Sequence, residues 1–384
     1  MAASPAFRTC SALLLTALSA CSSVRAPTAC QPWRLSAADS VVLAEEDTAF
    51  VGMPGASITV GIAGEWYIPD ASQNRVLVFS PSGSLIRILG RQGQGPGEFS
   101  GVGPFGVAVD SLVLIPDFGG RRLNVYHATG AAIGSIPYDG YLARLGRDRS
   151  TVWLGLLDLG NRRALLSVPA ERLRHPEAIQ PLVASLVPTP LQYREYPRLL
   201  DFSDVAVAAT GDTLVYGFGG LSFLVRAVLG TAASDTVVVP TCGRRGSPLA
   251  AVGDLLKRRP RTPEEDLSVS EQTAAALSAL LNIWRLETGE YLIWYQDPVI
   301  ESRGRILKGV AFLSILSPDL RRACVDARIE APGIGRPRLG LAGDTVLVLD
   351  QVVSAAAPDR ATTVVRKYPL DRSTCQWVST APGA

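Results

Sequence analysis

A segment of this chain occurs twice in register. WYIPDASQNRVLVFSPSGSLIRIL begins at Trp66, and VLIPDFGGRRLNVYHATGAAIGSI begins 47 residues later at Val113. Seven positions are identical between the copies: Ile68, Pro69, Asp70, Arg75, Val78, Gly83 and Ile86 match Ile115, Pro116, Asp117, Arg122, Val125, Gly130 and Ile133. Self-similarity at a fixed spacing of about 40 to 50 residues is typical of a repeat architecture.

The repeated segment predicts the strands of a β-propeller. From residue 57 the sequence contains four short runs of alternating apolar residues with turns between them, which is the content of one propeller blade. An acidic or small polar residue followed by alternating apolar residues occurs six times, at Glu65, Asp110, Ser150, Asp212, Glu290 and Asp344. We therefore predict an all-β fold, a six-bladed β-propeller of four-stranded blades, with residues 41–51 as a candidate closing strand.

Two insertions interrupt the repeats. Residues 167–200 are rich in proline, and residues 262–282 are predicted to form a short helix. Thr262 to Glu265 and Ser268 to Glu271 both fit the capping-box pattern, and an apolar run follows them. Such a helix can cap one face of the ring or simply lengthen a loop, and we favour the longer loop.

The N-terminus carries an export signal. Arg8 precedes a short apolar run, which ends in Leu18-Ser19-Ala20-Cys21 and resembles the lipobox of bacterial lipoproteins. Cys21 would then be the lipidated first residue of the mature protein, and an incidental or buried cysteine is the alternative. Because Ser22 stands where an aspartate often signals retention in the inner membrane, we expect the outer membrane, on its periplasmic or surface side.

These signals divide the chain into three parts. We predict a lipoprotein signal peptide at 1–20, a lipidated cysteine and tether at 21–40, and a single propeller domain at 41–384. Acyl chains would attach the protein to the membrane without a transmembrane helix. The arginines are scattered among acids, with a net charge of only +2, so the sequence indicates no nucleic-acid partner. We expect a monomer.

Four cysteines remain after the signal peptide and the lipid anchor are removed: Cys30, Cys242, Cys324 and Cys375. An even number in an oxidising compartment is consistent with two disulfides, for which three pairings exist. We favour Cys30 with Cys375, because ring-shaped folds often join their two ends. Four free buried thiols are the alternative, and no zinc-ligand spacing is present.

The segment IPDASQNRVLVFSPSG resembles the NHL repeat, in which an aspartate ends one strand and an arginine begins the next. The loop GRQGQGPGEF is similar to the GxGPGEF loop of six-bladed propeller lipoproteins with NHL-like repeats. The resemblance is strong over residues 57–136 and weakens afterwards. It implies an NHL-like six-bladed lipoprotein propeller, a group that is largely uncharacterised and therefore does not name a function.

The aspartate and arginine of this motif recur along the chain. The clear pairs are Asp70 with Arg75, Asp117 with Arg122, and Asp158 with Arg163. Looser copies are Asp297 with Arg303 and Asp350 with Arg360, and the fourth blade, near Gly217, lacks the pair. A charged ring at the channel mouth is one interpretation. We favour a charge-assisted clamp within each hairpin, since catalytic residues are needed once and not once per blade.

The sequence contains no recognisable catalytic set. Gly93, Gly95 and Gly97 lie in a loop that leads to a strand and not to a helix, so they do not form a dinucleotide-binding fingerprint, although backbone amides there could hold a ligand. His127 and His175 are the only histidines, too few for a three-histidine zinc site. We predict no cofactor and leave the catalytic residues unassigned.

We therefore expect a surface-anchored propeller that binds a protein, peptide or glycan partner as a scaffold, without catalysis of its own. The rival hypothesis is a lactonase-like hydrolase or lyase with one divalent cation, such as calcium, in the central channel. Such a site needs acid and amide oxygens that converge on the channel. The candidates in the sequence are Glu65, Asn74, Asn124, Asn161 and Asp201.

Overall fold

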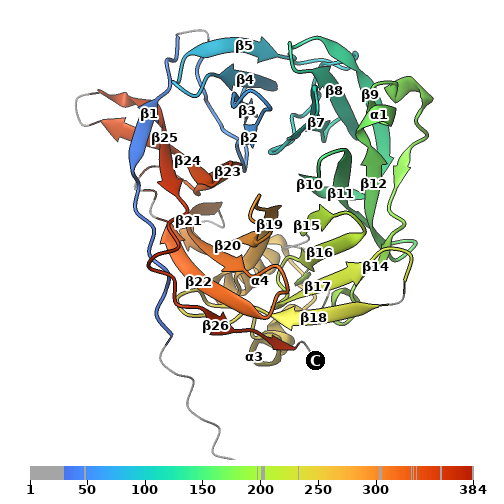
Figure 1. Cartoon of the computed structure of the whole chain (residues 1–384), viewed down its shortest axis with the longest axis vertical. Helices are drawn as coiled ribbons and strands as arrows, with labels where there is room; N and C mark the ends of the chain where they lie inside the picture. The colour runs from blue at the N-terminus through green and yellow to red at the C-terminus, as the bar shows by residue number, and fades with distance from the viewer. Residues whose placement is uncertain are drawn as a thin grey trace, which may run out of the picture. The chain divides into compact units, whose positions relative to one another are not determined.

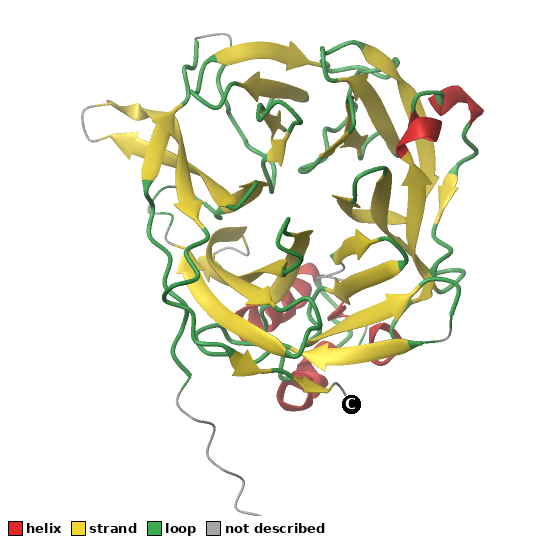
Figure 2. Cartoon of the chain, viewed as in Figure 1, coloured by secondary structure: helices red, strands yellow, loops and turns green. Residues whose placement is uncertain are grey.

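The chain folds into a ring of six β-sheets within the compact unit Pro32–Ala384 (Figure 1). The computed structural model describes residues 30–46, 49–196, 198–199, 204–231, 233–301, 305–329, 331, 333, 335–354 and 357–382. Strands dominate the ring, and helices lie both at its rim and behind it in this view (Figure 2). The predicted six-bladed β-propeller is confirmed.

The first three blades follow the chain in order. Blade 1 contains β2 (Thr59–Val60), β3 (Trp66–Asp70), β4 (Arg75–Phe79) and β5 (Leu85–Leu89). Blade 2 contains β6 (Val107–Val109), β7 (Leu112–Asp117), β8 (Arg122–His127), β9 (Ala132–Asp139) and β13 (Leu182–Val183). Blade 3 contains β10 (Tyr141–Arg147), β11 (Thr151–Asp158), β12 (Arg163–Pro169) and β14 (Val187–Pro188).

The last three blades include strands from both ends of the compact unit. Blade 4 contains β15 (Val205–Thr210), β16 (Thr213–Phe218), β17 (Phe223–Val228), β18 (Ser234–Val238) and β27 (Ala381–Pro382). Blade 5 contains β19 (Ala279–Arg285), β20 (Tyr291–Glu301), β21 (Arg305–Leu316), β22 (Arg322–Ile329) and β26 (Val378–Ser379). Blade 6 contains β23 (Arg338–Ala342), β24 (Thr345–Ser354), β25 (Ala357–Pro369) and β1 (Asp39–Val42).

The ring closes through β1, which is the outer strand of blade 6 although it precedes blade 1 in the chain. It pairs with β25 in an antiparallel register that sets Val41 opposite Val365. The compact unit begins at Pro32, earlier than the predicted domain start at residue 41. Trp33 is 2% exposed and its backbone N–H donates to the Val325 carbonyl, so part of the predicted tether belongs to the propeller.

Apolar side chains from facing blades form the core. Between blades 2 and 3, Leu114 packs in one cluster with Leu145. Between blades 6 and 1, Trp66 and Leu77 pack in one cluster with Leu347. The middle strands β3, β4 and β7 are buried at every position because both of their faces pack in this way, whereas the outer strand β5 alternates between buried or half-buried and exposed positions.

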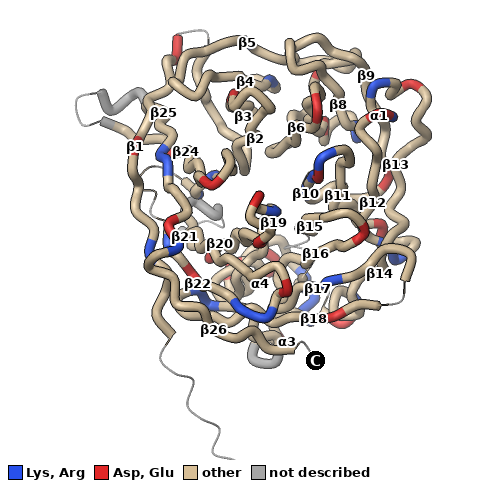
Figure 3. Tube along the Cα trace, viewed as in Figure 1, with Lys and Arg blue, Asp and Glu red and all other residues tan. Residues whose placement is uncertain are grey.

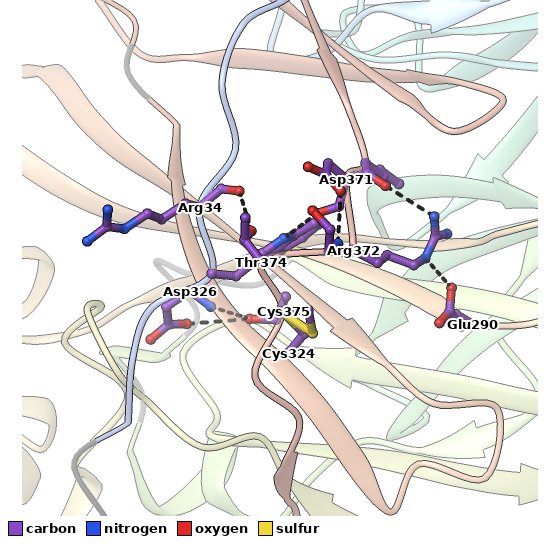
Figure 4. Close-up of a disulfide and its surroundings, with 12 residues drawn as sticks. Arg34, Glu290, Cys324, Asp326, Asp371, Arg372, Thr374 and Cys375 are labelled. Carbon is purple, nitrogen blue, oxygen red and sulfur yellow. Dashed lines mark hydrogen bonds and ion pairs between the residues drawn. A yellow bond between two sulfur atoms is a disulfide. The ribbon is translucent and has the colours of Figure 1, made fainter.

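The C-terminal segment crosses the outer edges of blades 5 and 4. After β25, the Arg372 side chain donates to Glu290, and the Thr374 hydroxyl donates to the Arg34 carbonyl (Figure 4). Cys375 then forms a disulfide with Cys324 on β22. The short strands β26 and β27 pair with β22 and β18. We call residues 370–382 the C-terminal strap.

The disulfide corrects one sequence expectation. Cys375 is joined to Cys324 and not to Cys30. The reason is local, because β26 follows Cys375 and pairs with β22, which carries Cys324, so that the two Cα atoms lie 5.6 Å apart. Cys30 and Cys242 are both half-buried.

The insertions form the helices. Residues 167–200 include α1 (Ala170–Leu173), a 3₁₀ turn η1 (Pro176–Ala178) and α2 (Gln192–Glu195), and they also supply the outer strands β13 and β14. The predicted helix at 262–282 is α4 (Pro263–Ala276), which packs against β20 and against α3 (Leu249–Leu256). Within the described residues, no helix has the length and apolar character needed to span a membrane.

The end of α4 is another correction. Thr262 caps the helix by accepting a hydrogen bond from the Glu265 N–H, as the first capping box predicts. Ser268 lies inside the helix, so the second capping box does not begin a helix. The helix ends at Ala276, because the apolar residues after it belong to the inner strand β19. Burial of that strand in blade 5 overrides its helical pattern.

The inner strands of the blades surround a central channel and run in one direction along it. Each blade repeats the same antiparallel order, and a parallel bridge joins Ser57, just before β2, to Leu339 in β23. We call the face where the inner strands begin the start face and the opposite face the end face. The loop that leads into each inner strand, here the leading loop, therefore lies at the start face.

Candidate functional site

The repeated aspartates lie at the start face, where each second strand ends. Asp70 and Asp117 are completely buried and accept backbone hydrogen bonds from the leading loops of their own blades. Asp70 accepts from the Met53 N–H at 3.0 Å, and Asp117 accepts from the Ser100 and Gly101 N–H groups at 3.0 and 2.9 Å. These carboxylates therefore hold loops in place.

The paired arginines stand across the hairpin turn from the aspartates. Arg75 Nε lies 3.5 Å from Asp70 Oδ2, and Arg122 Nε donates to Asp117 Oδ2 at 3.0 Å. Arg122 also donates to the Glu98 carbonyl in the leading loop. Each pair is a charge-assisted clamp on one blade and faces its own loop.

Later blades keep the aspartate and change its cation. Asp297 accepts from the Arg245 N–H at 3.0 Å, and Asp350 lies 3.6 Å from Arg366 Nε. Arg303 lies outside the described residues, and so does the side chain of Arg360. Among the described residues, the cations beside these aspartates are Arg245, from the leading loop of blade 5, and Arg366 on β25.

Blade 3 shows why the clamp weakens. Asp158 and Arg163 are register partners, but Asp158 accepts from the Asn161 backbone and side chain, and the structure shows no ion pair to Arg163 among the described residues. Only Gly140 separates β9 from β10, the inner strand of blade 3, so this blade has no long leading loop for the aspartate to hold. In blade 4, which lacks the motif, the Tyr193 hydroxyl donates to the Gly219 carbonyl instead.

The glycine-rich loop is held by blade 2 and does not open into a binding cradle. Glu98 accepts from the Gly95 N–H at 2.9 Å, and the Tyr126 hydroxyl donates to the Gly97 carbonyl at 2.8 Å. Gly97 has a φ of +73°, which favours glycine, and a Cβ there would meet Ala132. The loop joins β5 to β6.

The residues proposed for a calcium site are dispersed. Glu65 accepts from the Tyr67 hydroxyl, Asn74 accepts from the Val102 N–H, and Asn124 donates to the Glu98 carbonyl. Asn161 bonds to Asp158 in blade 3, and Asp201 lies outside the described residues. Among the described residues, no three histidine, cysteine or acidic side chains form a metal-binding group.

The other candidates lie away from the channel. His127 ends β8 and its Nδ1 lies 2.8 Å from the Thr129 hydroxyl, while His175 is exposed next to Glu177. Cys242 donates its backbone N–H to Asp326. Cys21 lies outside the described residues.

The central channel contains a cavity of about 220 Å³. Inner strands or adjoining residues of blades 1, 2, 3, 5 and 6 line it, and Figure 3 shows basic and acidic positions along β10 and β19 beside the centre of the ring. Its charged lining consists of Arg144, Arg147 and Arg285 with one acid, Glu287. Ile58, Trp284 and other apolar residues form the remaining wall. The cavity is therefore positively charged and partly apolar.

Arg144 bridges the channel wall. Its Nε donates to the Leu281 carbonyl at 2.6 Å, which links β10 of blade 3 to β19 of blade 5. Its guanidinium stacks 5.2 Å from the Phe105 ring centroid and lies 3.7 Å from Asp204 at the start face. Arg144 is only 6% exposed, so it is a buried structural residue of the channel wall.

Burial perturbs the charged groups around the channel. It lowers the pKa of Arg147 and of Arg336, the latter helped by repulsion from Arg144 and opposed by Asp204. It also lowers the pKa of Arg338 to about 10, with further repulsion from Arg336. Burial raises the pKa of Asp204, while Arg144 and Arg336 oppose that rise. Arg144, Arg336 and Arg338 therefore form a cluster of cations with the acids Asp204 and Asp350.

We expect Arg144→Met to lower the free energy of unfolding by about 1 to 3 kcal/mol at neutral pH, because it removes a buried charged hydrogen bond. Asp204 also loses a cation, so its folded-state pKa rises further. A carboxyl with a raised folded pKa destabilises the fold only above its unfolded pKa, so the deficit should shrink below the ordinary value of 3.8. Chemical denaturation at neutral pH and at a pH below 3.8 measures the free energy of unfolding, with the exposed Arg149→Met variant as control. A deficit that does not depend on pH would contradict the role of Asp204.

The arginines of the channel were not predicted from the sequence. Arg144 and Arg147 lie in YLARLGR, and Arg285 lies in NIWRLE, both already predicted as inner strands. The available signal was a charged residue within an otherwise apolar strand. Such a charge must find a partner or a water-filled space, and in a propeller the inner strand borders the channel.

Comparisons with known proteins agree with the fold. The profile of the DUF5128 family, described as a 6-bladed beta-propeller, matches residues 59–145. No curated protein matches the chain. A crystal structure of a DUF4221 family member from Bacteroides vulgatus aligns at 11% identity with a TM-score of 0.57, over 88% of this chain and 98% of that one.

Two further structures extend the comparison. A Bacteroides fragilis protein described as a candidate exported protein aligns at 11% identity with a TM-score of 0.52, over 87% of this chain and 94% of that one. A gluconolactonase from Xanthomonas campestris aligns at 12% identity with a TM-score of 0.44, over 88% and 99%. Likeness to the two Bacteroides structures at 11% identity shows the propeller fold and not the chemistry.

Proposed function

We propose that this chain is an exported binding protein, a propeller that receives its ligand in the central cavity and performs no catalysis. The observation that carries the proposal is the division of the charged residues. Buried aspartates such as Asp70 and Asp117 are occupied by leading loops, whereas the cavity is lined by three arginines and a single acid. That set attracts and orients a ligand.

The charge of the cavity also weighs against the rival metal enzyme. A divalent cation near Arg144, Arg147 and Arg285 would be repelled by like charges, and Glu287 is the single acid in the lining. A lactonase-like mechanism needs several oxygen ligands at one point, and the candidate ligands lie in separate local hydrogen bonds.

The test is a search for turnover and binding with the same purified protein. We expect no hydrolysis of a lactone and ester panel, with or without added calcium, and a rise in Tm with at least one compound from a set of peptides, glycans and small molecules. Lactone hydrolysis that needs a tightly held divalent ion and is lost in Glu287→Gln would instead establish the enzyme.

We also propose that lipid on Cys21 attaches the propeller to the outer membrane, on the strength of the lipobox in the sequence. Labelling of cells with a palmitate analogue should mark the protein, and Cys21→Ser should remove the label and release the protein from the membrane fraction. Cys10→Ser, in the same segment, is the matched control and should keep the label. Label that persists in Cys21→Ser would contradict the anchor.

A further inference from the structure

Two of the cavity arginines reach the same end of the channel. Arg144 Nε and the Leu281 carbonyl join β10 and β19 at one level. From that bond, β10 runs three residues to its last residue, Arg147, and β19 runs four residues to its last residue, Arg285. Strands rise about 3.3 Å per residue, so the two residues lie at similar heights at the end face. Both line the same cavity.

Neither of these arginines is neutralised by the protein. Among the described residues, no carboxylate lies within ion-pair distance of Arg147 or of Arg285, and the structure shows no hydrogen bond from the Arg147 guanidinium. Arg285 stacks 4.5 Å from the Tyr291 ring centroid, and its buried Nη1 has no hydrogen-bond partner. Arg147 is exposed and Arg285 is half-buried, so an anion that enters the cavity can still pair with their charges.

A further polar group in the lining is also unsatisfied. Thr59, on β2 in blade 1, is 6% exposed, and its buried hydroxyl has no hydrogen-bond partner. Thr59 lines the same cavity. A hydroxyl donor and two guanidinium groups around one space form a set of donors that lacks an acceptor.

The other walls of the cavity are apolar. Trp284 lines the cavity and its ring stacks on buried Trp294, with the centroids 6.1 Å apart and the planes nearly parallel. Ile58 and Leu341 also line it. The volume of about 220 Å³ is below the roughly 300 to 1,000 Å³ of pockets that enclose drug-sized ligands. The space fits a small molecule with one charged end.

We propose that the cavity binds a small organic acid, with its carboxylate between Arg147 and Arg285 and its apolar body against Trp284. This inference rests on the proposed binding function and names its ligand class. Guanidinium groups bind carboxylates through paired hydrogen bonds, and both arginines line the cavity. Inorganic phosphate offers the charge and lacks the apolar body.

The probes are benzoate, succinate and inorganic phosphate, each titrated into the full-length protein at constant ionic strength with chloride as the reference salt. Trp284 should report binding as a change in fluorescence, and calorimetry measures the same affinity without a label. We expect benzoate or succinate to bind and phosphate to bind at least about tenfold more weakly, since charge alone is shared by all three.

Matched variants locate the site. Arg147→Met and Arg285→Met should each weaken binding of the organic acid by about ten- to a hundredfold. Arg149→Met removes an exposed arginine two residues beyond β10, outside the cavity lining, and should leave the affinity unchanged. Trp284→Phe should remove the fluorescence signal while calorimetry still detects binding. Without ligand, Arg147→Met should leave the Tm unchanged, because this arginine is exposed, whereas Arg285→Met should lower it slightly through loss of the contact with Tyr291.

Three outcomes would overturn the inference. These are equal affinity for phosphate and the organic acids, equal weakening by Arg149→Met and Arg147→Met, and absence of binding by every organic acid. If the acids fail and a peptide or glycan still raises the Tm, the binding function stands without this ligand class. Metal-dependent lactone hydrolysis would instead overturn the binding function itself.

Discussion

Asp117→Ala should lower the free energy of unfolding by about 3 to 5 kcal/mol, which is typical of breaking one side of a buried ion pair. Asp117 is completely buried and accepts from the N–H groups of Ser100, Gly101 and Gly120 as well as from Arg122. The substitution would leave these three N–H groups without an acceptor and the half-buried Arg122 guanidinium without its carboxylate, although Arg122 keeps its bond to the Glu98 carbonyl. Urea denaturation followed by fluorescence measures the loss.

The chain contains its own control for this prediction. Asp158 has the same motif position in blade 3, where no long leading loop exists, and its partner is Asn161. Asp158→Ala should therefore cost only about 0.5 to 1 kcal/mol. Asp117→Asn keeps an acceptor oxygen and should lie between the two. Equal losses at Asp117 and Asp158 would contradict the loop-holding role and would favour a common role of the motif at the channel mouth.

The pattern of the sequence predicted the blades because a propeller repeats one unit, and repetition is visible without knowledge of any contact. The six predicted second strands correspond to β3, β7, β11, β16, β20 and β24. The strands β13, β14, β26 and β27 were not predicted. Each has two residues and pairs with a blade that is distant in sequence or separated by an insertion, so no local periodicity marks it.

The candidate site was less predictable than the fold. The Asp70 and Arg75 motif indicated a local clamp. Its second role, holding the leading loop, was not visible in the motif, because Met53, whose N–H donates to Asp70, lies 17 residues earlier in the chain. The cavity forms where inner strands of different blades border the same space, and the sequence does not show which strand ends meet there. Arg147 and Arg285 lie in different blades, and only the closed ring places both at one cavity.

Loss of the disulfide between Cys324 and Cys375 should have the other large effect. A cross-link over 51 residues restricts the unfolded chain, and the chain-entropy relation gives about 3 to 5 kcal/mol for loops of this order. Cys324 is 1% exposed on β22, so the disulfide fixes the C-terminal strap to a buried strand. Cys375→Ala should therefore lower the free energy of unfolding by about 2 to 4 kcal/mol.

The strap should also loosen locally before the ring unfolds. Without the disulfide, the strap keeps the contacts of Arg372 with Glu290 and of Thr374 with the Arg34 carbonyl, together with the two-residue strands β26 and β27. These are short and partly exposed, so they open more often than the blades. Trypsin should then cleave after Arg372 in Cys375→Ala and release the end of the chain while the ring stays intact.

The matched control is Ser373→Ala, an exposed strap position between the arginine and the cysteine. It should behave like the wild type in both stability and cleavage. Cys324→Ala and the double variant should match Cys375→Ala, because each removes the same cross-link and no second one. If Cys375→Ala unfolds and is cleaved as the wild type is, β26 and β27 alone hold the strap, and the disulfide makes no contribution to the closure of blades 4 and 5.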